Sequence, residues 1–400
     1  MKNKILIFIV VVLTFFACNH VETVYNFEVE ETIAIPLENL RAATPPFDLF
    51  DYCLIDNIET LIFYETSGKL VFYDMSTNSV YHNITLLKDR RLDAFEYINK
   101  DSILLLYSYT NDGIEIEFND FSLLDTLKLQ LVDFDGNVKK YYHFNCDEDN
   151  CTGINYKIEQ ILPPYTSLFY KTIKRMNNIV FFFPFSYGYY NFDTIKNNSP
   201  LIAYYDLHTE KFIVSKNVKL PYLKDKMYYP SNHDVLNFCI SANGLPLLRF
   251  FYSSDVFEWD YKNDKLIKYN LKSKLIDTIP PFSYPINDMN ATNARYSTIY
   301  YDNNNELYYS YLYLSSDIFG ENYWSVIIAD KNLNYINEVV NIKNLYNPAF
   351  FNKNIISYDP MQYNTIILKK SKLITERKDY NGYIKSIRQD IETKIKKRDF

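Results

Sequence analysis

A short segment that recurs five times constrains this chain more than any other feature. Each copy is an apolar or aromatic run that ends in Asp, followed by a polar turn and a second strand-like run. Asp74, Asp206 and Asp260 each precede a turn of five residues, and looser copies contain Asp135 and Asp330. An Asp side chain can accept hydrogen bonds from the backbone that follows it, and Asn tolerates positive φ, so such turns close without glycine. The repeat therefore predicts a series of β-hairpins.

The hairpins recur at the spacing of propeller blades. Successive Asp residues of the repeat are 61, 71, 54 and 70 positions apart, and short apolar runs with almost no helical periodicity fill residues 22–375. A propeller blade consists of four antiparallel strands, and kelch-type repeats run about 50 residues. We therefore predict an all-β fold, a β-propeller of six four-stranded blades over 22–375, with seven blades as the alternative. Tyr25 to Ile35 is predicted to be a strand that joins the last blade and closes the ring.

The C-terminal residues 376–400 follow a different pattern. Tyr383, Ile384, Ile387 and Ile391 recur at steps of three and four residues within a segment rich in Lys, Arg and Glu. This spacing places the apolar side chains on one helical face. We predict an amphipathic helix that packs on the outside of the propeller.

The N-terminus reads as a lipoprotein signal peptide. Two lysines precede the apolar run Ile5–Leu13, and Ala17 stands directly before Cys18. The run is too short to span a bilayer, so we expect cleavage of residues 1–17, lipidation of Cys18 and a short tether over residues 18–21. An ordinary signal peptide with an incidental cysteine is the alternative. Because Asn, not Asp, follows Cys18, we expect an anchor in the outer membrane, on either its periplasmic or its surface face.

Composition limits the partners and the cysteine chemistry. The net charge of −7 argues against a nucleic-acid partner, because phosphate binding needs clustered Lys and Arg. Four cysteines remain beside the lipidated one. Cys146 and Cys151 flank a polar turn, so an exported protein could join them in a disulfide. Cys53 and Cys239 lie in apolar segments and are expected to be buried thiols.

The segment Thr14–Cys18, the copies at Asp74, Asp206 and Asp260, and the overall length together resemble one known group of proteins. These are uncharacterised bacterial lipoproteins that carry a TolB-like six-bladed β-propeller domain of unknown function. The resemblance covers most of the chain after the signal peptide. It implies a propeller fold and a location in the cell envelope, and it brings no catalytic residues with it.

No catalytic or metal-binding motif appears in the sequence, and no cofactor is expected. The chain lacks the GxSxG, HExxH and glycine-rich phosphate signatures. The segments 133–137 and 147–149 contain carboxylates that could bind calcium, but polar turns explain both better. Glycoside hydrolysis needs two facing carboxylates. The candidates for that role are Glu115, Glu117, Glu258, Asp302 and Glu321.

Two functions remain open at this point. The first is a binding or scaffold module, not an enzyme, that presents a propeller face to a protein, peptide or glycan. The alternative is a hydrolase or lyase that acts on a glycan or peptide, with its site in the central channel. The segments expected to line the channel, Ile103–Tyr107 and Ile179–Phe183, are apolar and aromatic. This composition favours binding.

Overall fold

The structure is a computed structural model of the whole chain. It describes residues 21–36, 50–65, 68–88, 90–109, 128–142, 173–182, 202–218, 227–228, 236–250, 253–276, 282–283, 294–314, 323–340, 346–351, 354–359 and 365–396. The signal peptide and Cys18 lie outside these residues, as do Cys146 and Cys151.

Five antiparallel sheets each consist of four strands that are consecutive in the chain. In addition, there is one two-stranded sheet. Sheet 1 contains β2 (Phe50–Ile55), β3 (Ile58–Glu65), β4 (Lys69–Asp74) and β5 (Ser79–Thr85). Sheet 2 contains β6 (Arg90–Asn99), β7 (Ser102–Tyr109), β8 (Lys128–Val132) and β9 (Val138–Tyr142). Sheet 3 contains β10 (Lys174–Met176), β11 (Ile179–Phe182), β12 (Ala203–Asp206) and β13 (Lys211–Val214). Sheet 4 contains β15 (Leu236–Ile240), β16 (Pro246–Phe250), β17 (Asp255–Asp260) and β18 (Lys265–Asn270). Sheet 5 contains β20 (Ala294–Asp302), β21 (Leu307–Leu314), β22 (Tyr323–Asp330) and β23 (Tyr335–Val340). The two-stranded sheet contains β14 (Met227–Tyr228) and β19 (Phe282–Ser283).

Both ends of the chain meet in one further four-stranded sheet, sheet 6. It combines β24 (Tyr346–Phe351), β25 (Asn354–Asp359) and β26 (Thr365–Lys378) with β1 (Glu22–Pro36). β1 pairs with β26 along its length, from Glu22 opposite Lys378 to Pro36 opposite Thr365. The prediction that Tyr25 to Ile35 joins the last blade is confirmed.

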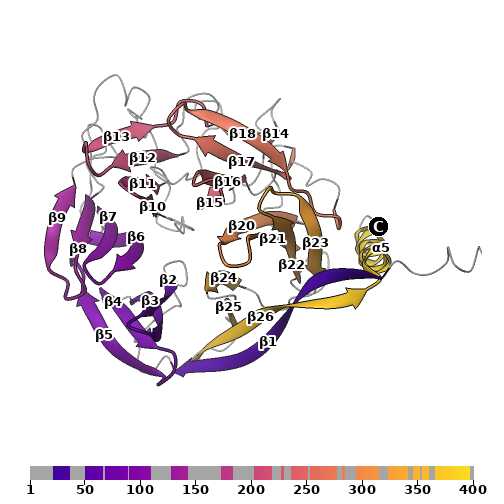
Figure 1. Cartoon of the computed structure of the whole chain (residues 1–400), viewed down its shortest axis with the longest axis horizontal. Coiled ribbons are helices and arrows are strands. Elements are labelled where there is room, and N and C mark those ends of the chain that lie inside the picture. The colour runs from indigo at the N-terminus through magenta and orange to yellow at the C-terminus, as the bar shows by residue number, and fades with distance from the viewer. Residues whose placement is uncertain are drawn as a thin grey trace, which may run out of the picture.

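The sheets are arranged around a ring, as in a β-propeller (Figure 1). The first strand of each sheet lies on the inner side of the ring and the fourth on the outer side. The all-β class and the propeller arrangement are therefore confirmed.

Each outer hairpin depends on the Asp that ends its third strand. Asp74 Oδ1 accepts hydrogen bonds from the backbone N–H groups of Ser76 and Thr77, at 2.8 and 3.3 Å. The left-handed residue of this turn is Asn78, with φ of 53°. Asp206 and Asp260 bond the backbone that follows them in the same way. The predicted hairpins are thus confirmed at these positions.

In sheet 2 the prediction chose the wrong residue of the repeat. Asp133 is the residue that closes the turn, because its carboxylate accepts hydrogen bonds from both the backbone and the side-chain amide of Asn137. Asp135 lies within that turn. Asp330 makes the same pair of hydrogen bonds with Asn334, so sheets 2 and 5 share one turn type. Both turns leave the Asp and Asn four residues apart.

Hydrophobic clusters fill the spaces between neighbouring sheets. One cluster is shared by sheets 1 and 2, and others by sheets 2 and 3, 3 and 4, 4 and 5, and 5 and 6. Between sheets 6 and 1, the ammonium of Lys370 lies 3.0 Å from the Glu59 carboxylate. Many of the abundant aromatic side chains are completely buried in these clusters: Phe72, Tyr205, Trp259, Tyr308 and Tyr311 are examples. The aromatic content therefore serves the packing between sheets.

A side-chain amide links the closing strand to the neighbouring sheet. The side chain of Asn337, on β23, accepts a hydrogen bond from the backbone N–H of Tyr25 at 3.1 Å. Its Nδ2 donates to the carbonyl oxygen of the same Tyr25 at 2.9 Å. Asn337 is only 1% exposed. Because both polar backbone groups of Tyr25 depend on one buried side chain, this contact joins sheet 6 firmly to sheet 5.

The C-terminal helix α5 spans Tyr380–Lys396 and lies outside the ring (Figure 1). It begins later than the predicted boundary at residue 376, because β26 continues to Lys378 in register with β1. Asp379 caps the helix through a hydrogen bond from the Gly382 backbone N–H at 3.0 Å. Tyr380, Ile384 and Ile391 are buried against the cluster between sheets 4 and 5. Within the described residues, no helix is long and apolar enough to cross a membrane.

Candidate functional site

The first strands of the sheets carry the residues closest to the ring centre. β2 contacts β6 and β24, and β15 contacts both β10 and β20, so the first strands of neighbouring sheets approach one another (Figure 1). The segments Ile103–Tyr107 and Ile179–Phe183 were predicted to line the centre, but β7 and β11 are second strands. That prediction is wrong, and so is the argument from apolar inner strands.

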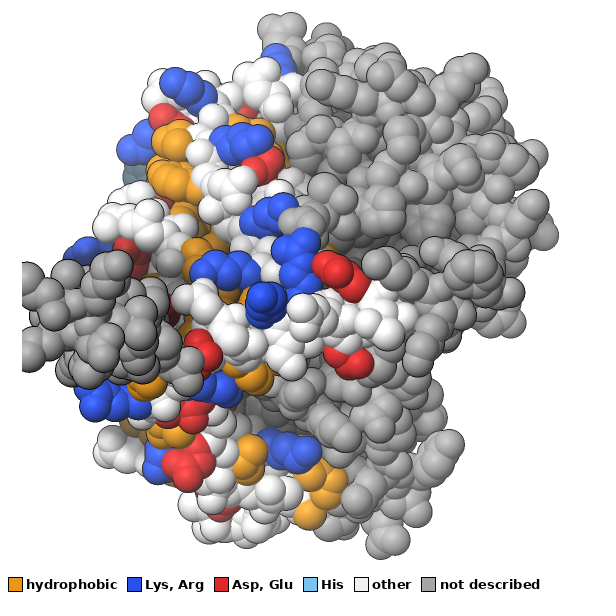
Figure 2. Space-filling view, turned by 90° about the vertical axis from the view of Figure 1, so that its right-hand side faces the viewer, with side chains coloured by type: hydrophobic (Ala, Val, Ile, Leu, Met, Phe, Trp, Pro, Cys, Tyr) orange, Lys and Arg blue, Asp and Glu red, His pale blue; other side chains and the backbone are white. Residues whose placement is uncertain are grey.

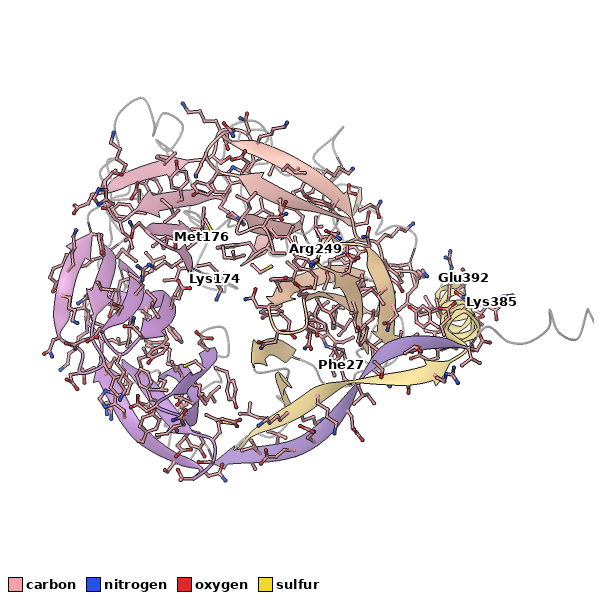
Figure 3. The ribbon with its side chains drawn as sticks, in the orientation of Figure 1. Phe27, Lys174, Met176, Arg249, Lys385 and Glu392 are labelled. Atoms are coloured by element: carbon pink, nitrogen blue, oxygen red, sulfur yellow. The ribbon has the colours of Figure 1, made fainter. Side chains whose placement is uncertain are left out.

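Three charged side chains from three different sheets interact at this inner side. They are Asp51 on β2, Glu96 on β6 and Lys174 on β10. Figure 3 shows Lys174 on the inner side of the ring. We call Asp51, Glu96 and Lys174 the inner charge cluster.

Burial raises the pKa of both carboxyls in the inner charge cluster. The pKa of Asp51 is raised by desolvation, against the attraction of Lys174 and a hydrogen bond from the Tyr52 backbone N–H. Desolvation raises the pKa of Glu96 to about 7; Lys174 opposes the rise and the negative charge of Asp51 adds to it. One lysine therefore does not offset the cost of burying two carboxylates.

Glu96 uses only part of its hydrogen-bonding capacity. The backbone N–H of Arg175 donates a hydrogen bond to its carboxylate. The Oε2 atom is buried and has no hydrogen-bond partner within the described part of the chain. A buried carboxylate oxygen without a donor is costly, and such groups in native proteins call for an explanation. A ligand that supplies a donor would provide one.

Two thiols lie near the inner charge cluster. Cys53 follows Asp51 on β2, and Cys239 lies on β15, where it interacts electrostatically with Lys174. Both cysteines are free thiols; Cys239 is buried, as predicted, whereas Cys53 is only partly buried. Burial raises the pKa of Cys239 to about 12, so it stays a neutral thiol at physiological pH. Neither thiol has the lowered pKa of a nucleophile.

The cluster contains two acids and one base, without a metal site. No group of three His, Cys, Asp or Glu residues within the described ranges could hold a metal ion. The carboxylates can accept hydrogen bonds from a ligand, and a carboxyl with a pKa near 7 can also exchange a proton. The arrangement therefore suits recognition of a ligand with hydrogen donors, or acid–base chemistry.

Other buried charges in the described residues have structural partners. Glu258 accepts hydrogen bonds from Ser241 at 2.5 Å and from Asn243 and Tyr269, each at 2.9 Å. Asp302 closes the turn between β20 and β21 through Asn304 and Asn305. Neither of these candidate carboxylates belongs to the inner charge cluster. The remaining candidates, Glu115, Glu117 and Glu321, lie outside the described residues.

A second buried carboxylate network joins α5 to the propeller. Glu338 accepts hydrogen bonds from the Ser273 hydroxyl at 2.8 Å, the Lys274 backbone N–H at 3.0 Å and the Ser325 hydroxyl. Its own backbone N–H donates to the Tyr380 hydroxyl at 2.6 Å. Burial raises the pKa of Glu338 against these hydrogen bonds. Because protein donors already fill the hydrogen-bonding capacity of the Glu338 carboxylate, we assign this network a structural role in attaching α5.

Arg249 is a buried cation whose two terminal nitrogens have partners, whereas its Nε has none within the described residues. It is completely buried, and its guanidinium carbon lies 3.6 Å from the ring centroid of Tyr296. It donates hydrogen bonds to the carbonyl oxygens of Ser254 and Leu271 at 3.0 and 3.1 Å. Burial lowers its pKa to about 10, which leaves it charged at physiological pH. Carbonyl groups and an aromatic face thus balance this charge within sheets 4 and 5.

Sequence reasoning missed the inner charge cluster, although one signal could have located part of it. The hairpin Asp ends the third strand of a sheet, so counting back two strands from Asp74 reaches Phe50–Ile55 and its single charged residue, Asp51. The predicted disulfide between Cys146 and Cys151 lies outside the described residues and stays a prediction.

The fold and the cluster together define the protein as a β-propeller with charged inner strands. No protein-family model matches the sequence, and no curated protein matches it. Among solved structures, the crystal structure of a member of the DUF4221 family from Bacteroides vulgatus is similar, with a TM-score of 0.62 and 14% sequence identity. The alignment covers 88% of this chain and 99% of that chain. At this identity, the likeness shows the fold alone.

Proposed function

We propose that this chain is a lipid-anchored protein of the cell envelope whose propeller binds a ligand at the inner charge cluster. The signal peptide, the expected lipidation of Cys18 and the absence of Asp after it support an address at the outer membrane. The ligand is a protein segment, a peptide or a glycan. Nucleic acid is a poor candidate because the net charge is −7.

We also propose that the six four-stranded sheets are the complete set of blades. Each of the five sheets built from consecutive strands shares a hydrophobic cluster with the next. Sheet 6 follows sheet 5 through the contact of Asn337 with Tyr25 and adjoins sheet 1 through Lys370 and Glu59. This cyclic sequence of contacts supports six blades over seven.

The observation that carries the binding proposal is the buried, unpartnered Oε2 atom of Glu96 beside Asp51 and Lys174. Three sheets contribute one charged residue each, and the inner strands of propellers are where the blades converge. The buried carboxylates of Glu258, Asp302 and Glu338 are held by protein donors, and Arg249 donates to two carbonyl oxygens, while its Nε has no partner within the described residues. Of the buried carboxylate oxygens in the part of the chain that the structure describes, only Glu96 Oε2 lacks a donor, which a ligand could supply.

A thermal-shift screen tests the binding proposal. The mature chain, its Glu96→Gln variant and a control, Asp101→Asn, are heated with a panel of oligosaccharides and tripeptides. The Asp101 side chain is 88% exposed and lies at the beginning of β7, so it serves as a matched carboxylate away from the cluster. We expect at least one panel member to stabilise wild type and the control but not Glu96→Gln. Equal stabilisation of all three proteins would contradict the proposal.

A hydrolase or lyase is a second candidate, favoured by one specific observation. Glu96, with a pKa of about 7, has the second carboxyl of Asp51 as a neighbour, and general acids in glycosidases have raised pKa values. In this case Glu96 would donate a proton to the leaving group. Incubating the same oligosaccharides with wild type and Glu96→Gln, followed by chromatography, distinguishes the two functions. Products that wild type forms and the variant does not would identify an enzyme.

A further inference from the structure

The charges of the inner charge cluster do not balance, and this imbalance points to the chemistry of the ligand. Asp51 and Glu96 carry two negative charges when both are ionised. Lys174 carries one positive charge; Arg175 acts on Glu96 less strongly than Lys174 does, and its guanidinium donates a hydrogen bond to the Asn177 carbonyl oxygen. We infer that the ligand presents an aliphatic ammonium group, such as a lysine side chain of a peptide, to Asp51 and Glu96. This inference rests on the proposed binding function and narrows its ligand class.

An ammonium group fits the free hydrogen-bonding capacity of the cluster. It has three N–H donors and no acceptor, and the buried Glu96 Oε2 lacks a donor. It also adds a positive charge beside the two carboxylates, where Lys174 is the stronger of the two resident cations. Hydrogen bonds between charged partners are about twice as strong as those between neutral ones. An ionised carboxylate that lacks a donor therefore gains more from an ammonium than from a neutral hydroxyl in the same position.

Other ligand classes fit the cluster less well. An anion would meet two carboxylates, and Lys174 already interacts with both of them. A divalent cation prefers six or more oxygen ligands, whereas the described residues contain no group of three His, Cys, Asp or Glu residues suited to a metal. An ammonium group can donate to both carboxylates of the cluster and leave its third N–H to water or another acceptor.

The charged neighbours of Glu96 set the expected pH dependence. Asp51 from β2, and Lys174 and Arg175 from β10, are the charged groups that act on its carboxyl. With a pKa of about 7, Glu96 is mostly neutral at pH 6 and mostly ionised at pH 8. Because the ammonium binds the ionised carboxylate, affinity should rise about tenfold from pH 6 to pH 8. A lysine side chain remains protonated over this whole range.

Calorimetry with two matched peptides tests this inference. The probes are acetyl-Gly-Lys-Gly-amide and the same peptide with norleucine in place of lysine, which keeps the carbon chain and removes the charge. We expect wild type to bind the lysine peptide at least tenfold more tightly than the norleucine peptide at pH 8. Glu96→Gln should lose this preference, and Asp101→Asn should keep it.

The Lys174→Met variant should change the affinity for the lysine peptide in the opposite direction from Glu96→Gln. This substitution removes the resident ammonium that competes for the two carboxylates, so the lysine peptide should bind at least as tightly as in wild type. A variant in which the fold had merely been damaged would bind less tightly. Loss of lysine-peptide binding in a folded Lys174→Met variant, judged by an unchanged far-UV circular dichroism spectrum, would overturn the inference.

The outcomes separate the ligand class from the function itself. If a neutral or anionic member of the screening panel binds in a manner that depends on Glu96, while the lysine peptide does not bind, the ligand class is wrong and the binding function stands. If calcium or magnesium chloride alone stabilises wild type but not Glu96→Gln, the cluster is a metal site and the inference fails. If no probe responds to either cluster variant, both proposals fail.

Discussion

Replacing Glu96 with Gln should change how the stability of the protein depends on pH. The folded protein raises the pKa of this carboxyl from 4.5 to about 7, so the native state holds a proton that the unfolded chain releases. A carboxyl whose pKa is raised in the folded state stabilises the fold at low pH, and this stabilisation is lost as the pH rises from 4.5 through about 7. Linkage gives a loss of about 2.5 kcal/mol in wild type between pH 5 and pH 8. Gln cannot ionise, so the variant avoids this loss.

The assay is urea unfolding at pH 5, 6, 7 and 8, monitored by tyrosine and tryptophan fluorescence. We expect the free energy of unfolding of Glu96→Gln, relative to wild type, to rise by about 2.5 kcal/mol across the series. Asp51 titrates in both proteins, and loss of its charged neighbour shifts the difference in the same direction. The free energy of unfolding of the exposed Asp101→Asn control should depend on pH in the same way as that of wild type. Parallel curves for Glu96→Gln and wild type would refute the burial of this carboxyl.

Two further changes test the ring closure and the anchor. Asn337→Leu should lower the free energy of unfolding by about 3 kcal/mol, because both backbone groups of Tyr25 lose their buried partner; limited proteolysis should then cut β1 first. If β1 of Asn337→Leu resisted the protease as well as β1 of wild type, the role of Asn337 in holding β1 would be contradicted. Cys18→Ser should leave the precursor uncleaved. Wild type should partition into detergent, and a version that starts at Glu22 behind an ordinary signal peptide should stay in the aqueous phase, as expected when two or more acyl groups hold the chain. Soluble proteins of identical mature mass from the wild-type and Cys18→Ser genes would rule out lipidation.

The fold was predictable because it depends on local signals that repeat. The Asp at the end of a third strand bonds the next turn, so Asp74, Asp206 and Asp260 reveal hairpins directly in the sequence. The five copies correspond to the five sheets with consecutive strands. Sheet 6 has no copy, because its third and fourth strands come from opposite ends of the chain. A blade assembled in this way leaves no local hairpin signal.

The inner charge cluster was harder to predict, because the relevant strands give weak signals. β10 consists of three residues, Lys174–Met176, and contains no alternating apolar pattern. In sheet 2, eighteen residues separate β7 from β8, so counting strands back from the hairpin fails. The electrostatic interaction between Glu96 and Lys174 joins two sheets, and no periodicity within one strand encodes it. Only the assembled ring brings these residues together.

The place where β1 begins favours independence of the proposed anchor and the proposed binding site. The Asn381 side chain at the beginning of α5 donates a hydrogen bond to Glu22 at 3.2 Å, which fixes the start of β1 beside this helix. Figure 2 shows that side of the molecule, where basic, acidic and apolar side chains are intermingled over its described part. The inner charge cluster lies on first strands, on the opposite side of the blades from β1 (Figure 1).

The proposed lipidation of Cys18 would place the anchor four residues before Glu22, and β1 begins there on the outer side of the ring. Four extended residues reach about 14 Å at most, so the membrane should lie against the rim near α5 and not against the inner strands. Lipidation should then change where the protein is located without changing what it binds. In detergent, lipidated wild type and Cys18→Ser should bind the lysine peptide with equal affinity. A difference of more than about threefold between them would show that the anchor reaches the binding site, contrary to its attachment at the rim.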